Sequence, residues 1–252
     1  MKKFFSFLAI AMIACATVFA ADNNKVIDKN LNVGSFEKIS VKGSDMVVYT
    51  QGDKVSVRLH GTQEQIDAML VNVEGNTLNV SRKSSFNNGT GFTNFLRALV
   101  NGETISTSVV VYVTAPALAR VKVTGSGDFK ANGEVDTDNI EIVVTGSGDI
   151  DFKSLVCDNA DISVTGSGDI EIDKLESVAS SMSVRGSGDI HVKQQRVRKT
   201  DLNIYGSGDI VVQCNNCGEV NASVYGSGDI TLSGQYQLKT KNVRGSGDIN
   251  QR

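Results

Sequence analysis

The four-residue motif Gly-Ser-Gly-Asp occurs seven times in this chain of 252 residues and constrains its fold more than any other feature. The copies begin at Gly125, Gly146, Gly166, Gly186, Gly206, Gly226 and Gly245, so the intervals between them are 21, 20, 20, 20, 20 and 19 residues. A nearly constant period of this length is typical of proteins that stack one structural unit on the next. We therefore expect stacked repeats over the C-terminal half of the chain.

The residues that flank the motif predict β-strands. Apolar and polar side chains mostly alternate before each copy, as in Ile142/Val144 and Ile162/Val164, and Phe or Ile follows each Asp. A period of two is typical of a strand with one buried face. One strand pair is too small to be stable alone, so the repeats must stack with like residues in columns.

The predicted fold class is all-β, a single-stranded right-handed parallel β-helix with coils of about twenty residues. The right-handedness follows from the general preference of parallel crossovers. An antiparallel sandwich of hairpins is the alternative, and it fits less well because the same corner recurs in the same phase. The predicted organisation is a signal peptide at 1–20, an N-terminal linker at 21–35 and a β-helix domain at 36–252, in which 36–120 form irregular coils with an insertion at 81–108 and 121–252 hold the seven repeats.

The less regular N-terminal part still carries local signals. Gly43-Ser44-Asp45 is a degenerate copy of the motif with one Gly missing, which places the start of the solenoid near residue 36. Thr62 and Gln65 form a capping box that predicts a short helix over 62–70. Gly75-Asn76 predicts a hairpin turn, and a further helical turn is expected within 94–100.

The first twenty residues are typical of a secretory signal. Lys2 and Lys3 precede an apolar run from Phe4 to Ile13, and small residues lead up to Ala20. The run is too short to span a bilayer comfortably, so no transmembrane span is predicted and the protein is expected in the periplasm, on the outer cell surface or secreted. Lipid anchoring at Cys15 is the less favoured route, because Met fits the first lipobox position poorly.

Charge and repetition argue against two classes of function. Lys plus Arg number 25 against 28 Asp plus Glu, and this net charge of −3 argues against a nucleic-acid partner. Identical repeats offer no unique constellation of acid, base and cation, so we expect no enzyme. Two alternatives stay open, a β-helical polysaccharide lyase or hydrolase and a structural assembly protein that self-associates end to end through an open strand edge.

Four features together carry a family resemblance. They are Phe36-Glu37-Lys38-Ile39 leading into Gly43-Ser44-Asp45, then Gln51-Gly52-Asp53, then the segment from Val113 to Leu118, and finally the run of Gly-Ser-Gly-Asp motifs. In these features the chain resembles the "putative auto-transporter adhesin, head GIN domain" family, a domain of unknown function from Bacteroidetes-type bacteria. The resemblance covers most of the chain after the leader. It implies an exported, β-helix-like envelope protein, and an adhesin or binding module whose partner is a glycan or a protein of the envelope or host surface.

Stacking of the coils would place the acidic residue of each motif in one column, namely Asp128, Asp149, Asp169, Asp189, Asp209, Asp229 and Asp248. Carboxylates ~5 Å apart repel by about 1 kcal/mol in water, so backbone donors or bound cations must offset the repulsion. The favoured interpretation is a turn in which Asp accepts backbone N–H groups. A weak calcium column is the alternative, and no other cofactor is predicted.

A second column comprises the residue before each motif, namely Thr124, Thr145, Thr165, Arg185, Tyr205, Tyr225 and Arg244. Tyr and Arg are enriched at binding hot spots, so Arg185, Tyr205, Tyr225 and Arg244 are the candidate ligand-binding residues. Ordinary stacking between coils is the alternative interpretation.

Cys214 and Cys217 are close enough in sequence to close a local disulfide in an oxidising compartment. A redox role of the pair is the less favoured alternative, because no thioredoxin-like βαβ context surrounds it. Cys157 would share the phase of Cys217 three coils away, about 14 Å at ~4.8 Å per coil, which is too far for a disulfide. His60 and His191 are isolated in the sequence, and we expect both at the surface.

Overall fold

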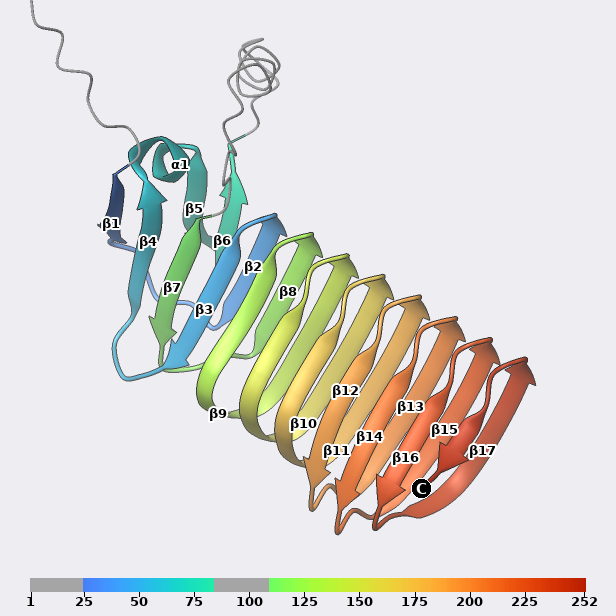
Figure 1. Ribbon diagram of the computed structural model, residues 1–252. Coiled ribbons are helices and arrows are strands. Elements are labelled where there is room, and N and C mark those ends of the chain that lie inside the picture. Colours follow the sequence, from blue (N-terminus) through green and yellow to red (C-terminus); the bar gives the residue numbers. More distant parts are fainter. Residues whose placement is uncertain (1–24, 84–108) are drawn as a thin grey trace, which may run out of the picture.

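The computed structural model describes residues 25–83 and 109–252, and their strands form one 18-stranded sheet wound into a solenoid (Figure 1). Neighbouring coils pair in parallel over the repeats, with partners about twenty residues apart. The predicted all-β parallel solenoid is therefore confirmed. The predicted signal peptide at 1–20 and helical turn at 94–100 lie outside the described residues, as does most of the predicted insertion.

The repeat region begins with long strands and continues with shorter ones. The elements are β9 (Asp128–Gly146), β10 (Ile150–Gly166), β11 (Ile170–Gly186), β12 (Ile190–Gln195), β13 (Lys199–Gly206), β14 (Ile210–Asn215), β15 (Glu219–Gly226), β16 (Ile230–Gly234), β17 (Gln237–Gly245) and β18 (Ile249–Gln251). The later coils split into two strands where the chain turns at a positive φ, at Arg196, Asn216 and Gly234.

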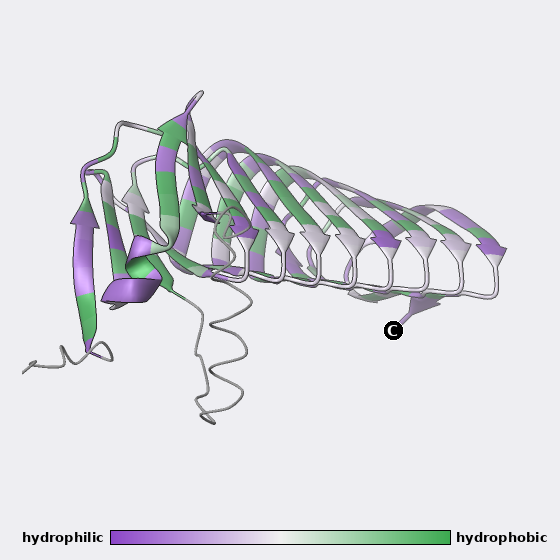
Figure 2. Cartoon of the chain, turned by 90° about the horizontal axis from the view of Figure 1, so that it is seen from above, coloured by the Kyte–Doolittle hydropathy of each residue, from purple (hydrophilic) through white to green (hydrophobic). Residues whose placement is uncertain are grey.

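The core consists of columns of like side chains inside the coils. One column runs through Ile150, Ile170, Ile190, Ile210 and Ile230, each paired in register with the next and at most 1% exposed. Figure 2 shows the resulting alternation of hydrophobic and hydrophilic residues along the strands. Burial of each Ile contributes ~1.5–3 kcal/mol, so the stacked columns supply the stability that a single coil lacks.

The corner motif needs both of its glycines. Gly166 has a φ of +130°, a conformation that side chains disfavour. A Cβ on Gly168 would lie 2.1 Å from the carbonyl oxygen of Gly148 in the preceding coil. A Cβ on Gly166 would likewise lie 2.2 Å from the carbonyl oxygen of Gly146. The first Gly therefore permits the turn, and both permit the close stacking of successive turns.

The N-terminal elements pack against the first coil at one end of the solenoid (Figure 1). They are β1 (Val26–Leu31), β2 (Lys38–Gly43), β3 (Met46–Gln51), β4 (Ser56–Thr62), α1 (Gln63–Asp67), β5 (Met69–Glu74), β6 (Thr77–Arg82), β7 (Val110–Ala115) and β8 (Arg120–Gly125). β2 and β3 pair in parallel with β8 and β9, whereas β4 pairs antiparallel with β1 and β7. The stack thus changes from parallel coils to an antiparallel layer at this end.

The structure confirms two local predictions in this layer and corrects one. Thr62 and Gln65 form the capping box of α1, and Gly75 and Asn76, both at positive φ, join β5 to β6. The helix is shorter than the predicted 62–70, because Met69 and Leu70 belong to β5, which pairs with β6. The segment 21–35, expected to be a linker, contains β1. The expectation was wrong because Ile27 and Leu31 pack against the core while β1 pairs with β4. No helix in the described ranges has the length and apolar character needed to cross a membrane.

Candidate functional site

The four candidate ligand-binding residues lie in one column on the outside of the solenoid. β11, β13, β15 and β17 contribute one residue each, and the pairing runs from Arg185 to Tyr205, from Tyr205 to Tyr225 and from Tyr225 to Arg244. Arg185, Tyr205 and Tyr225 directly follow buried residues, namely Val184, Ile204 and Val224, so the alternation of the strand points their side chains outward. Arg244 continues the column in register with Tyr225. We call this column the Arg–Tyr ladder.

The side chains of the Arg–Tyr ladder contact one another throughout. The rings of Tyr205 and Tyr225 stack with centroids 5.1 Å apart and planes 4° apart. Arg185 Cζ lies 5.3 Å from the Tyr205 ring centroid, and Arg244 Cζ lies 5.8 Å from that of Tyr225. Cation–π contacts of this kind stabilise exposed side chains by about 0.5–1 kcal/mol each. These contacts link the four side chains to one another without a ligand.

This stacking decides which atoms a ligand can reach. The ring faces are directed toward the adjacent members of the ladder, which leaves the phenol hydroxyls, ring edges and guanidinium groups as the accessible parts. Arg185 and Arg244 lie three coils apart, roughly 14 Å at ~4.8 Å per coil. The ladder therefore offers a row of hydrogen-bond donors with a positive charge at each end.

A column of small polar residues accompanies the ladder on the same face. Its members lie two positions before the ladder residues and are Ser183, Asn203, Ser223 and Asn242. Hydroxyl and amide groups both donate and accept hydrogen bonds. Sequence reasoning did not single out this column, although the two-residue period of the strands would have revealed it.

The seven motif aspartates form the predicted column, and its carboxylates accept backbone hydrogen bonds. The N–H of Asp169 donates to Oδ1 of Asp149 at 2.9 Å, and that of Asp189 donates to Oδ1 of Asp169 at 2.8 Å. The same bond recurs from Asp149 through Asp248, at 2.7 to 3.2 Å. In residues 25–83 and 109–252, no group of three or more His, Cys, Asp or Glu side chains is arranged to hold a metal ion. The calcium column stays a prediction.

Cys214 and Cys217 are neighbours in the structure as free thiols. Each Sγ lies 3.9 Å from Oε1 of Gln194, a buried residue of the preceding coil. Cys157 is a separate buried thiol in β10. The disulfide between Cys214 and Cys217 thus stays a prediction, and its two sulfur atoms are close together.

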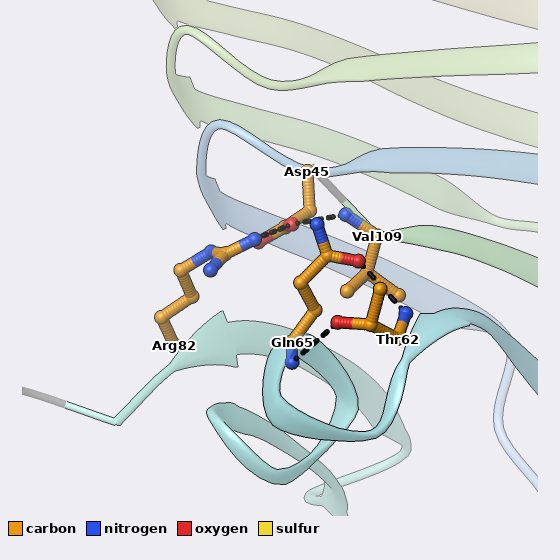
Figure 3. Close-up of polar contacts among 5 residues, drawn as sticks. All are labelled: Asp45, Thr62, Gln65, Arg82 and Val109. Carbon is orange, nitrogen blue, oxygen red and sulfur yellow. Dashed lines mark hydrogen bonds and ion pairs between the residues drawn. The ribbon is translucent and has the colours of Figure 1, made fainter. Parts of the chain in front are cut away.

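A buried ion pair at the N-terminal end escaped the sequence reasoning (Figure 3). Asp45 is 1% exposed, and its carboxylate accepts hydrogen bonds from Arg82 Nε at 2.9 Å, Arg82 Nη2 at 2.6 Å and the backbone N–H of Val109 at 2.8 Å. Because the motif copy here lacks one Gly, Met46 pairs with Asp128 and Asp45 falls beside Gly127. The Asp45 carboxylate therefore lies outside the column of motif aspartates. It connects the first coil to Arg82 in β6 and to Val109, which directly precedes β7.

Comparisons with known proteins agree with this architecture. The model of the family described as "Putative auto-transporter adhesin, head GIN domain" matches residues 35–235 and 177–252. No curated protein matches the chain.

Solved structures resemble the fold over nearly its whole length. A putative adhesin from Bacteroides fragilis has 23% identity and a TM-score of 0.75, covering 90% of this chain and 97% of its own. A putative lipid binding protein from Parabacteroides distasonis has 23% identity and a TM-score of 0.72, covering 91% and 98%. A putative adhesin from Parabacteroides merdae has 18% identity and a TM-score of 0.70, covering 91% and 97%. These likenesses concern the fold. The family match over most of the sequence shows that the chain belongs to the family described as "Putative auto-transporter adhesin, head GIN domain".

Proposed function

We propose that this protein is an exported binding module of the cell envelope, an adhesin without catalytic activity, that binds acidic glycans along the Arg–Tyr ladder. The observation that carries the proposal is the in-register column of Arg185, Tyr205, Tyr225 and Arg244. The family description as adhesins supports a binding role and an exported or surface location.

The chemistry of the ladder favours an acidic glycan. Guanidinium groups pair with carboxylates or sulfates through two parallel hydrogen bonds, and two of them mark the ends of the ladder. Between them, the hydroxyls of Tyr205 and Tyr225 and the polar side chains of Asn203 and Ser223 match the hydroxyl groups of sugars. A protein of the envelope or host surface is the alternative partner, because exposed Tyr and Arg also serve protein interfaces.

Two other functions are less well supported. A lyase or hydrolase would need acid and base side chains in distinct environments, whereas the motif aspartates from Asp128 to Asp229 repeat the same backbone contact from coil to coil. End-to-end assembly would need an apolar, open strand edge, yet the interior column through Leu202 and Ala222 ends at Lys241. Lys241 Nζ donates to the carbonyl of Ile249 at 2.7 Å, and an inward lysine discourages edge-to-edge pairing.

The proposed location follows from the leader. Cleavage after Ala20 would release the protein into the periplasm or to the outside of the cell. Lipidation of Cys15 is the alternative route and would tether the same binding face to a membrane.

An array of glycans and envelope proteins tests the proposal. The binding variant is Y205T/Y225T, since Thr145 and Thr165 already hold the same column position in earlier coils. R185Q/R244Q removes the two charges, and R198Q serves as the control because Arg198 is an exposed arginine outside the ladder. We expect acidic glycans to bind wild type and R198Q, and both ladder variants to lose the signal. Equal binding by all four proteins would reject the ladder, and protein-only binding would reject the glycan.

A further inference from the structure

The side chains inside the solenoid change from apolar to polar at one position along its axis. One interior column runs through Leu155, Leu175, Gln194 and Cys214, in register. The facing column runs through Ala160, Ser180, Thr200 and Val220. Both columns therefore carry their polar members in the same few coils, deep in the core.

The polar members form a closed hydrogen-bond network around Gln194. Gln194 Nε2 donates to Ser180 Oγ at 2.8 Å, Thr200 Oγ1 donates to Gln194 Oε1 at 2.9 Å, and Ser180 Oγ donates to Thr200 Oγ1 at 3.2 Å. All three side chains are at most 4% exposed. The network fixes the amide of Gln194 so that its Oε1 faces the thiols of Cys214 and Cys217, each at 3.9 Å.

The backbone holds the two cysteines in a fixed turn. Asn216 adopts a φ of +57°, which reverses the chain between them. In the next coil, the carbonyl of Gln235 accepts the N–H of Cys217 at 2.9 Å, and the N–H of Gln235 donates to the carbonyl of Cys214 at 3.0 Å. Both cysteines are thus anchored to one residue of the following coil.

The two thiols differ in access and in acidity. Cys214 is buried and Cys217 is half-buried, so Cys217 is the more accessible of the two thiols. The hydrogen bond from the Cys214 thiol lowers the pKa of Cys217 to about 7, and the same contact raises the pKa of Cys214. The accessible sulfur is therefore the better nucleophile, and the buried one is placed to resolve a mixed disulfide.

We propose that Cys214 and Cys217 are a redox-active dithiol, in which Cys217 is the attacking sulfur and Cys214 the resolving one. The Cys217 thiolate attacks a disulfide R–S–S–R, forms a mixed disulfide and releases one R–S⁻. Cys214 then loses its proton to solvent, and its sulfur attacks Cys217 Sγ and releases the second R–S⁻. Two protein thiols are oxidised and one small disulfide is reduced to two thiols.

Oxidation locks the turn between β14 and β15. The new bond takes both S–H donors away from Gln194 Oε1, which keeps the hydrogen bond from Thr200. The network around Gln194 therefore survives in both redox states, and only the turn at the surface is stiffened. This property is independent of the proposed glycan binding.

Equilibration of the full chain with glutathione buffers, followed by acid quenching, alkylation and peptide mass mapping, tests the proposal. We expect Cys214 and Cys217 to lose alkylation in parallel, and the peptide that holds both to become about 2 Da lighter. Cys157 serves as the internal reference and should stay alkylatable after unfolding. The C214S variant should stop at a mixed disulfide on Cys217.

Two results would overturn the inference. One is full alkylation of both cysteines in excess oxidised glutathione. The other is a mixed disulfide that forms on Cys214 in the C217S variant as fast as it forms on Cys217 in the C214S variant. The C15S and C157S variants control for the other two thiols of the chain and should behave as wild type does.

Discussion

The rings of Tyr205 and Tyr225 lie parallel, 4° apart in plane and 5.1 Å apart in centroid, although twenty residues separate them in sequence. The coil spacing sets this distance, because residues in register on adjacent strands lie ~4.8 Å apart. A surface built this way owes its geometry to the core beneath it. Binding along the Arg–Tyr ladder should therefore depend on the stacking of the coils.

The closeness of the coils makes a specific prediction for glycine. The G168A variant should lose about 3 kcal/mol of unfolding free energy, because its Cβ would lie 2.1 Å from the carbonyl oxygen of Gly148 and the two coils must separate. The G133A variant is the matched control, since no atom lies within 4 Å of its added Cβ. Urea unfolding measures both. Equal stability of the two variants would contradict the tight stacking of the corner.

The buried ion pair predicts a large effect at the N-terminal end. The R82A variant should lose about 3–5 kcal/mol of unfolding free energy, because Asp45 would remain 1% exposed without its ionic partner and with one backbone donor left. The K193A variant is the control, since Lys193 pairs with Asp173 at the surface, where solvent screens the pair and its loss should change the unfolding free energy little. Thermal and urea unfolding compare the two. If R82A loses no more unfolding free energy than K193A, the ion pair of Asp45 and Arg82 does not anchor the first coil.

Substitutions in the aspartate column distinguish a structural turn from a calcium site. The D169N variant should unfold close to wild type, because the amide Oδ1 can accept the N–H of Asp189, whereas D169A should lose about 1 kcal/mol. Melting curves with calcium and with a chelator should coincide. A calcium-dependent rise in melting temperature that D169N abolishes would establish the metal column instead.

The thiol pair predicts a pH dependence of alkylation under a phosphine reductant. Cys217 is protonated and slow below its pKa of about 7 and is thiolate above it, so its rate should reach half its maximum near that pH. Burial, with help from Asp158 and Asp136, raises the pKa of Cys157 to about 12, so that thiol should stay unlabelled at neutral pH. In the C214A variant the midpoint for Cys217 should rise toward 9 because the lowering hydrogen bond is gone. An unchanged midpoint would contradict the coupling.

Much of the fold was predictable because its causes are local or periodic. The alternation around Ile142 and Val144 predicts a strand, and the repeat phase predicts the columns. The capping box of Thr62 and Gln65 lies within four consecutive residues, so the short helix was equally visible.

The remaining features depend on contacts between distant segments. β1 is a strand because of its pairing with β4, which its own sequence does not reveal. Asp45 and Arg82 are 37 residues apart, and only the folded chain brings them together. The twenty-residue period does not predict the position of Gln194, because the strand register shifts by one residue in this coil. Leu175 pairs with Gln194, whereas the period would pair it with Gln195.

Titration calorimetry with an acidic oligosaccharide identified on the array tests the central claim most directly. Wild type and Y205T/Y225T are compared, and the recovered ligand is then examined by chromatography. We predict that wild type binds, that the variant binds at least about tenfold more weakly, a loss of ~1.4 kcal/mol, and that the oligosaccharide returns intact. Equal affinity of the two proteins, or a shortened oligosaccharide, would contradict a non-catalytic binding site on the Arg–Tyr ladder.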